Sequence, residues 1–348
     1  MIDFRYHLVS IVAVFLALAI GIVVGATALQ PHALALLDRE SNSAKREIAQ
    51  DRTQINSMQN EINADQTLDQ AAAPILLHNL LTGQKVVMVT APGSEGAAIN
   101  GITSALKQAG AQITGQAALQ PAFFDTNAST ESSLEALAVK DAPPGIMPSD
   151  KTGQQDPIAR IAGQQEAAQI IAAALVTEDT PDTTDLPASQ VKTILSDFSQ
   201  QGYLQVSPAN GSSTMAQATL AVMVIPANPP TAGDTDPANL ALISLGGQLK
   251  MAGRGVVMAG SLAGSGAGSA IDELIYGGTG IQLSSVDDAD SEDGQILVAQ
   301  ALSYLVLGHK PSAYGVLADA VPTPAPTPSP TPTPTPSPTP SPSHTSRG

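Results

Sequence analysis

The sequence predicts an α/β protein, in which an N-terminal transmembrane helix and a coiled-coil helix precede a three-layer domain with a mostly parallel sheet. Three observations predict it. An uncharged apolar stretch lies near the N-terminus, short apolar runs alternate with helical patterns further on, and Pro occupies every second position from 322 to 342. We therefore expect a transmembrane anchor (1–30), a coiled-coil stalk (31–73), an α/β domain (84–318) and a disordered tail rich in Pro, Thr and Ser (319–348).

The composition excludes several classes of function. Hydrophobic residues make up 43% of the 348 residues, but aromatic residues only 3%, so the core is expected to be aliphatic. The net charge of −16 opposes binding to nucleic acid, and none is expected as a partner. The chain has no cysteine, which excludes disulfides, iron–sulfur sites and thiol catalysis.

The apolar stretch is long enough to cross a bilayer. Residues 8–29 carry no charge, and as a helix they would extend about 33 Å. The apolar core of a signal peptide is usually shorter, about 7–15 residues, which favours an uncleaved anchor. Cleavage after Ala28 is the alternative, because Ala26 and Ala28 have the small-residue spacing of a cleavage site. We expect the N-terminus inside and the α/β domain outside the cytoplasm, although Lys and Arg near the span do not favour this orientation.

One face of the span carries small residues. Ala17, Gly21 and Gly25 follow one another at intervals of four. This spacing allows two membrane helices to approach closely, so we expect helix association there. The alternative is that Gly and Ala are simply common in membrane helices.

A heptad pattern follows the span. Apolar residues at intervals of seven, with companions three positions later, form a seam typical of a coiled coil. The seam consists of Leu34, Leu37, Ile48, Ile55, Met58 and Ile62. Because the helix continues a membrane span, we expect a parallel homo-oligomer, weakened by Asp51 and Asp65 in the seam. The alternative is one amphipathic helix lying on the domain. Pro74 is expected to end the helix.

The following region alternates between strand and helix patterns, which implies a parallel sheet covered on both faces. Strands are expected at 85–90, 111–119, 203–206, 218–227, 255–260 and, as the last strand, 281–287. Helices are expected at 95–109, 157–176, 191–200, 239–252, 269–275 and 294–307. Residues 126–155, rich in Ser, Thr, Pro and Gly, are expected to form a long surface loop.

Two polar motifs could carry chemistry. The acidic run at 287–293 could hold a hard cation, but it lacks the spacing of a calcium-binding EF-hand loop. The favoured interpretation is that Asp290 or Ser291 caps the last helix. The glycine-rich stretch at 259–270 lacks the Lys of a phosphate-binding P-loop and is expected to be a flexible turn. The crevice at the strand ends, near Gly93 and Gly264, is the default pocket.

No catalytic or metal-binding constellation is recognisable. The five histidines are scattered, and Met88, Met215, Met223, Met251 and Met258 have the spacing of core residues. Copper(I) sites need clustered Met, His or Cys. We therefore predict no catalytic residue, no cofactor and no enzymatic activity, and leave any metal ligand unassigned.

Several stretches resemble the actinobacterial copper transporter family. They are "FRYHLVSIVAVFLALAIGIVVG", the coiled segment after it, "APPGIMP", the helix ending "IIAAALV" and "LSSVDDADSEDGQILVAQALSYLVLGHKPSAYG". The similarity covers roughly residues 1–318. It implies a membrane or envelope location, a channel-like role in keeping cellular copper low, and copper as the transported ion. It supplies no metal-ligand motif.

The sequence thus predicts a membrane-anchored envelope protein of copper homeostasis, with copper efflux or a channel-like role implied by the resemblance. The alternative is a non-transport envelope scaffold or sensor whose α/β domain binds a partner or a small ligand. The tail is expected to reach into the cell wall, since an extended polyproline chain of 21 residues spans about 65 Å.

Overall fold

The computed structural model describes residues 4–143, 146, 161–179, 185–226, 236–317 and 320–321, without the side chains of 4–5, 26–41 and 210. The chain forms two compact units, Met1–Leu68 and Asp69–Gly348. The expected α/β class is confirmed. The prediction of a disordered tail falls on residues that lie almost entirely outside the described ones.

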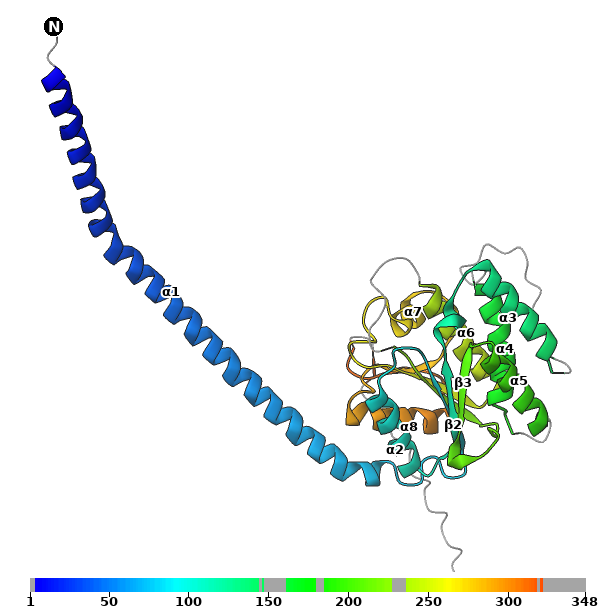
Figure 1. Ribbon diagram of the computed structural model, residues 1–348. Coiled ribbons are helices and arrows are strands. Elements are labelled where there is room, and N and C mark those ends of the chain that lie inside the picture. The colour runs from blue at the N-terminus through cyan, green and yellow to red at the C-terminus, as the bar shows by residue number, and fades with distance from the viewer. Residues whose placement is uncertain are drawn as a thin grey trace, which may run out of the picture. The chain divides into compact units, whose positions relative to one another are not determined.

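Helix α1 spans Phe4–Leu76, so the described residues of the expected anchor and stalk are helical (Figure 1). The prediction that Pro74 ends the helix is wrong by two residues. The helix continues past Pro74 because the residues after it are held in place. The Leu77 N–H donates to the Ala73 carbonyl at 2.9 Å, and the side chains of Leu77 and Leu81 are fully buried in the second unit. Burial of these leucines outweighs the single hydrogen bond that proline removes.

The second unit is built on one sheet, in which the described residues form seven strands in the order β3-β2-β1-β4-β5-β6-β7. The strands are β1 (Lys85–Thr90), β2 (Gln112–Leu119), β3 (Leu204–Pro208), β4 (Leu220–Val224), β5 (Gly255–Ala259), β6 (Ser284–Val286) and β7 (Ala313–Tyr314). All neighbouring pairs are parallel except β2 and β3. The expected, mostly parallel sheet is thus confirmed.

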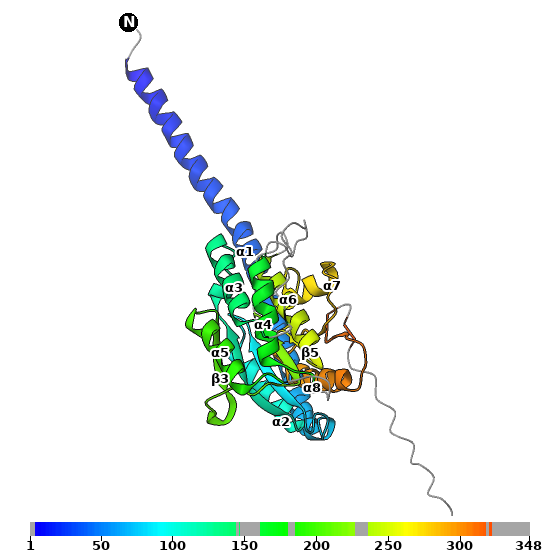
Figure 2. The same cartoon turned by 90° about the vertical axis from the view of Figure 1, so that its right-hand side faces the viewer.

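Helices cover both faces of the sheet, as Figures 1 and 2 show. One face packs against α2 (Gly96–Gln108) and α8 (Glu292–Val306). The other packs against α3 (Ala128–Asp141), α4 (Ala162–Leu175), α5 (Ala188–Gln200), α6 (Pro237–Ala252) and α7 (Ala270–Tyr276). Short 3-10 turns lie at Pro121–Phe124 and Ala209–Gly211.

The central strand β1 shows why the sheet needs two covers. Val86 and Met88 belong to the core on one face, and Val87 and Val89 to the core on the other. Because neighbouring side chains of a strand point to opposite faces, a continuous apolar run requires helices on both sides.

Three sequence predictions are corrected by the structure. Part of the expected loop at 126–155 is helix α3, whose Leu134, Leu137 and Ala138 are buried at helical spacing. The strand expected at 281–287 is not the last, because β7 follows it. Met251 is 75% exposed rather than part of the core, whereas the other four expected core methionines are buried.

The close approach of α3 and α4 depends on Gly163, and we predict that Gly163→Ala destabilises the second unit. A Cβ on Gly163 would lie 2.5 Å from the Glu131 carbonyl oxygen, so the helices would have to separate. Such overpacking costs about 1–3 kcal/mol, measurable by urea denaturation. Gly266→Ala is the matched control, because a Cβ there meets nothing within 4 Å. Equal stability of the two variants would contradict this account of the packing.

Candidate functional site

The N-terminal part of α1 has the apolar composition of a membrane-spanning helix. Tyr6–Gly25 is long and apolar enough to cross a membrane, with a mean hydropathy of 2.9. Its large aliphatic side chains from Leu8 to Val24 are all more than half exposed in the single chain. A helix that is apolar on every side is suited to hydrocarbon rather than to water.

The residues predicted for helix association lie on an open face of this span. A Cβ added at Gly21 or Gly25 would meet nothing within 4 Å, and Ala17 is exposed one turn earlier. The face can therefore accept a neighbouring helix at close range. Contact with a second copy stays a prediction.

The predicted coiled-coil seam is also uncovered in the single chain. Ile48, Ile55, Met58 and Ile62 are 54%, 62%, 53% and 48% exposed. Leu34 and Leu37 lie outside the described side chains. The four described residues form a row of aliphatic groups on a helix whose other residues in this region are mostly polar.

The acidic run after β6 forms hydrogen bonds that hold neighbouring loops together. The Asp287 carboxylate accepts hydrogen bonds from the N–H groups of Val316 and Leu317, at 2.9 and 3.1 Å. Asp290 accepts one from the Leu262 N–H at 3.1 Å. Ser291 is the N-cap of α8 and accepts from the Gly294 N–H at 2.9 Å, which confirms the predicted cap. These bonds join the segments that follow β5, β6 and β7.

Asp288 differs from its neighbours because part of its charge is unsatisfied. Its Oδ1 is buried without a hydrogen-bond partner, while Oδ2 lies 3.4 Å from the Ser291 hydroxyl. Burial, followed by the adjacent charge of Asp287, raises the pKa of Asp288 to about 6. Buried carboxyl groups with such a pKa are common in functional sites, and this one lies at the carboxyl ends of parallel strands, where ligands bind in many α/β proteins.

The glycine-rich segment after β5, expected to be a flexible turn, is held by its own hydrogen bonds. The Gly264 N–H donates to the Ser261 hydroxyl at 3.1 Å. Ser269 is the N-cap of α7 and accepts from the Asp272 N–H at 3.0 Å.

At the end of β1, the Ser94 hydroxyl donates to the Val224 carbonyl at the end of β4, at 2.7 Å. A pocket near Gly93 and Gly264 stays a prediction.

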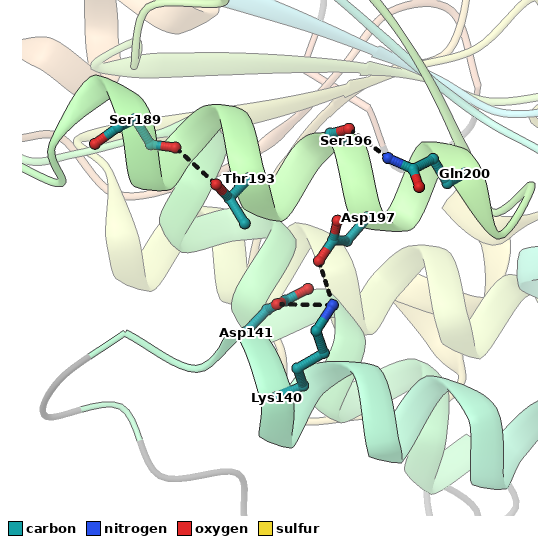
Figure 3. Close-up of polar contacts among 7 residues, drawn as sticks. All are labelled: Lys140, Asp141, Ser189, Thr193, Ser196, Asp197 and Gln200. Carbon is teal, nitrogen blue, oxygen red and sulfur yellow. Dashed lines mark hydrogen bonds and ion pairs between the residues drawn. The ribbon is translucent and has the colours of Figure 1, made fainter.

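A second charged cluster joins α3 to α5 (Figure 3). The Lys140 ammonium lies 2.5 Å from Asp197 Oδ2 and 3.9 Å from Asp141 Oδ1. The Asp141 side chain is only 4% exposed, and its Oδ2 has no hydrogen-bond partner. Burial, then the charge of Asp197, raises the pKa of Asp141. The hydrogen bond to Asp197 raises the pKa of Lys140.

The remaining polar side chains in Figure 3 do not join this cluster. Thr193 donates to the Ser189 carbonyl at 3.0 Å, and Gln200 donates to the Ser196 hydroxyl at 2.9 Å, both within α5. Sequence reasoning missed the cluster, because its members lie on separate helices and α3 was expected to be a loop. Among the described residues, no group of three His, Asp or Glu side chains is arranged to hold a metal ion.

Comparison with known proteins identifies the family. The family model described as "Copper transport outer membrane protein, MctB" matches residues 1–324. The chain belongs to this family. Its relatives include the proteins named copper transporter MctB of Mycobacterium tuberculosis and Mycobacterium bovis, each 26% identical over 320 residues, 90% of this chain and 96% of the relative. The Mycobacterium leprae protein of the same name is 26% identical over 318 residues, 91% of this chain and 96% of its own.

The match confirms the resemblance seen in the sequence and extends over both structural units. It covers the span, the seam, the α/β domain and the acidic run after β6, because all of these lie within residues 1–324. The relatives are matched over nearly their whole length.

Replacing Asp288 by Asn is predicted to stabilise the second unit at pH 7. The folded pKa of about 6 exceeds the ordinary 3.8, so folding favours the neutral form, and this stabilisation is lost as the pH rises through 6. Asp288→Asn keeps the side chain neutral, and the expected gain at pH 7 is about 1–3 kcal/mol, shrinking to nearly zero below pH 4. Glu95→Gln, at an exposed position, should show no such trend in urea denaturation. If the variant were less stable than the wild type at pH 7, the claim that the charged form of Asp288 destabilises the fold would be wrong.

Replacing Lys140 by Met is predicted to destabilise the contact between α3 and α5 at high pH. Without the ammonium group, Asp141 and Asp197 face each other unscreened, but protonation of Asp141 relieves the repulsion. Because Lys140 is 63% exposed, solvent screens its charge, so the expected loss of stability at pH 8 is small, and it is smaller still at pH 5. Lys192→Met, an exposed change on α5, is the control in the same denaturation series. A loss that grows toward pH 5 would refute the role assigned to Lys140.

Proposed function

We propose that this chain is a membrane-anchored envelope protein of copper homeostasis that helps to keep cellular copper low. The observation that carries the proposal is the family match over residues 1–324, with relatives named copper transporters matched over 96% of their length. Copper is cargo in this proposal rather than a resident cofactor.

The structure supports the membrane part of the proposal through α1. Tyr6–Gly25 provides one span, and the side chains exposed along it are those that lipid would cover. In this arrangement the N-terminus lies inside, and the α/β domain and the tail lie outside the cytoplasm. The tail then extends toward the cell wall.

The composition of the span favours a second candidate function. Residues 8–29 carry no charged side chain that could line a water-filled path, and an aqueous pore made of such helices would have aliphatic walls. A scaffold or sensor needs the span only as an anchor, and its α/β domain would bind a partner or a small ligand. The unsatisfied Asp288, at the carboxyl ends of the strands, is where such a ligand would be expected.

The proposal predicts that a strain lacking the gene accumulates copper. Total cellular copper should rise above the wild-type level as external copper increases, and the intact gene should restore it. Equal copper in the deletion, wild-type and complemented strains would refute the role in copper homeostasis. Envelope proteins that co-purify with the chain, together with unchanged copper, would favour the scaffold.

A matched pair of variants tests the need for the anchor in the same strain. Ile20→Lys places a charge within the span, at a cost of about 2.5–3.5 kcal/mol near its centre, and should move part of the chain out of the membrane fraction and weaken complementation. Asn60→Lys adds the same charge to an exposed position beyond the span and should do neither. Normal membrane retention of Ile20→Lys would contradict the anchor.

A further inference from the structure

The segment 42–68 of α1 leaves one row of aliphatic side chains open to water. Ile48, Ile55 and Ile62 recur every seven residues, Met58 lies three residues after Ile55, and each is about half exposed or more. On a straight helix a seven-residue row drifts by about 20° per heptad, and winding around another helix keeps the row in line. Burying these four side chains would remove from water all the large apolar groups that this segment leaves uncovered, except Leu68 at its end.

The opposite face of the same helix needs no partner. Thr53 donates to the Ala49 carbonyl at 2.9 Å, Ser57 to the Gln54 carbonyl at 2.9 Å, and Thr67 to the Asn63 carbonyl at 2.8 Å. These hydroxyl groups are satisfied within their own helix and are exposed. The apolar row is thus the one face of the segment that a second helix would stabilise.

The charges beside the row indicate the direction of that second helix. In heptad terms, with the isoleucines at position a, the acidic Glu47 and Glu61 stand at g, and the basic Lys45 and Arg52 stand at e. In a parallel pair in register, each g residue lies beside the e residue five positions later on its partner, so Glu47 would meet Arg52. An antiparallel pair would instead place g beside g and e beside e, which brings like charges together.

We propose that residues 42–68 of two copies form a parallel, in-register, two-stranded coiled coil. Its seam is Ile48, Ile55, Met58 and Ile62, and Glu47 of each copy pairs with Arg52 of the other. Isoleucine at a without isoleucine at d favours two strands over three or four. Asp51 and Asp65 also stand at d, where the carboxylates of the two copies face each other and weaken the dimer. This inference does not depend on the role in copper homeostasis.

Cysteine cross-linking of the full chain in detergent tests the geometry directly. The chain has no cysteine, so a single introduced thiol reports alone. Ile55→Cys and Met58→Cys should each form a disulfide-linked dimer under mild oxidation, because identical seam residues face each other in a parallel pair. Asn60→Cys, at position f on the far side of the helix, should cross-link at least tenfold more slowly. Equal cross-linking of seam and far-side variants, or of neither, would overturn the proposal.

A charge exchange tests the register independently. Glu47→Lys and Arg52→Glu should each raise the dissociation constant of the dimer about fivefold, as measured by sedimentation, since each places like charges together. The double variant should recover the wild-type affinity, and an equimolar mixture of the single variants should form mixed dimers. Asp51→Leu should tighten the dimer. A double variant no tighter than either single one would overturn the pairing of Glu47 with Arg52.

Discussion

The structure depends on one constraint, which is that aliphatic side chains are more stable when they are removed from water. Their burial contributes about 25 cal/mol of favourable free energy for each Å² of apolar surface. The two units of the chain meet it in different ways. In the second unit, the sheet and its helices bury most of the described large apolar groups against each other. The described side chains of α1 at 6–25 and 42–68 include almost no buried large apolar group, so their cover has to come from outside the single chain. In the proposed arrangement, lipid covers the span and a second copy of the helix covers the seam.

The same constraint explains where the second unit departs from a simple aliphatic core. Asp141 and Asp288 each keep one carboxylate oxygen buried and without a hydrogen-bond partner, although an unpaired buried charge is costly. In both cases the pKa is raised, because the neutral form fits the site better. Their surroundings differ: Asp141 lies beside a lysine that ties two helices together, whereas Asp288 lies at the carboxyl ends of parallel strands beside Asp287. Asp288 is therefore the better candidate for ligand recognition in this unit.

Much of the fold could be predicted from the sequence, because the buried strands are continuous apolar runs and most helices show a clear period. Helix α3 was missed because Ser, Thr and Glu fill its first turns, and β7 because two residues carry no period. The contact of Lys140 with Asp197 joins residues 57 positions apart, and no local pattern encodes it. The cap at Ser291 was predictable, since its signal is local. The family was predictable from motifs, whereas the role in copper homeostasis rests on the relatives rather than on any metal-binding group in the described residues.

Hydrogen exchange of the full chain in liposomes tests the central claim most directly, because it reports whether the uncovered faces of α1 become covered. The backbone amides of Tyr6–Gly25 should be protected at every protein-to-lipid ratio, since lipid covers the span. The amides of 42–68 should be protected at high protein density and should exchange faster as added lipid dilutes the chains and the dimers separate. Exchange in 42–68 that is fast at every density, or equally slow at every density, would contradict cover by a second copy.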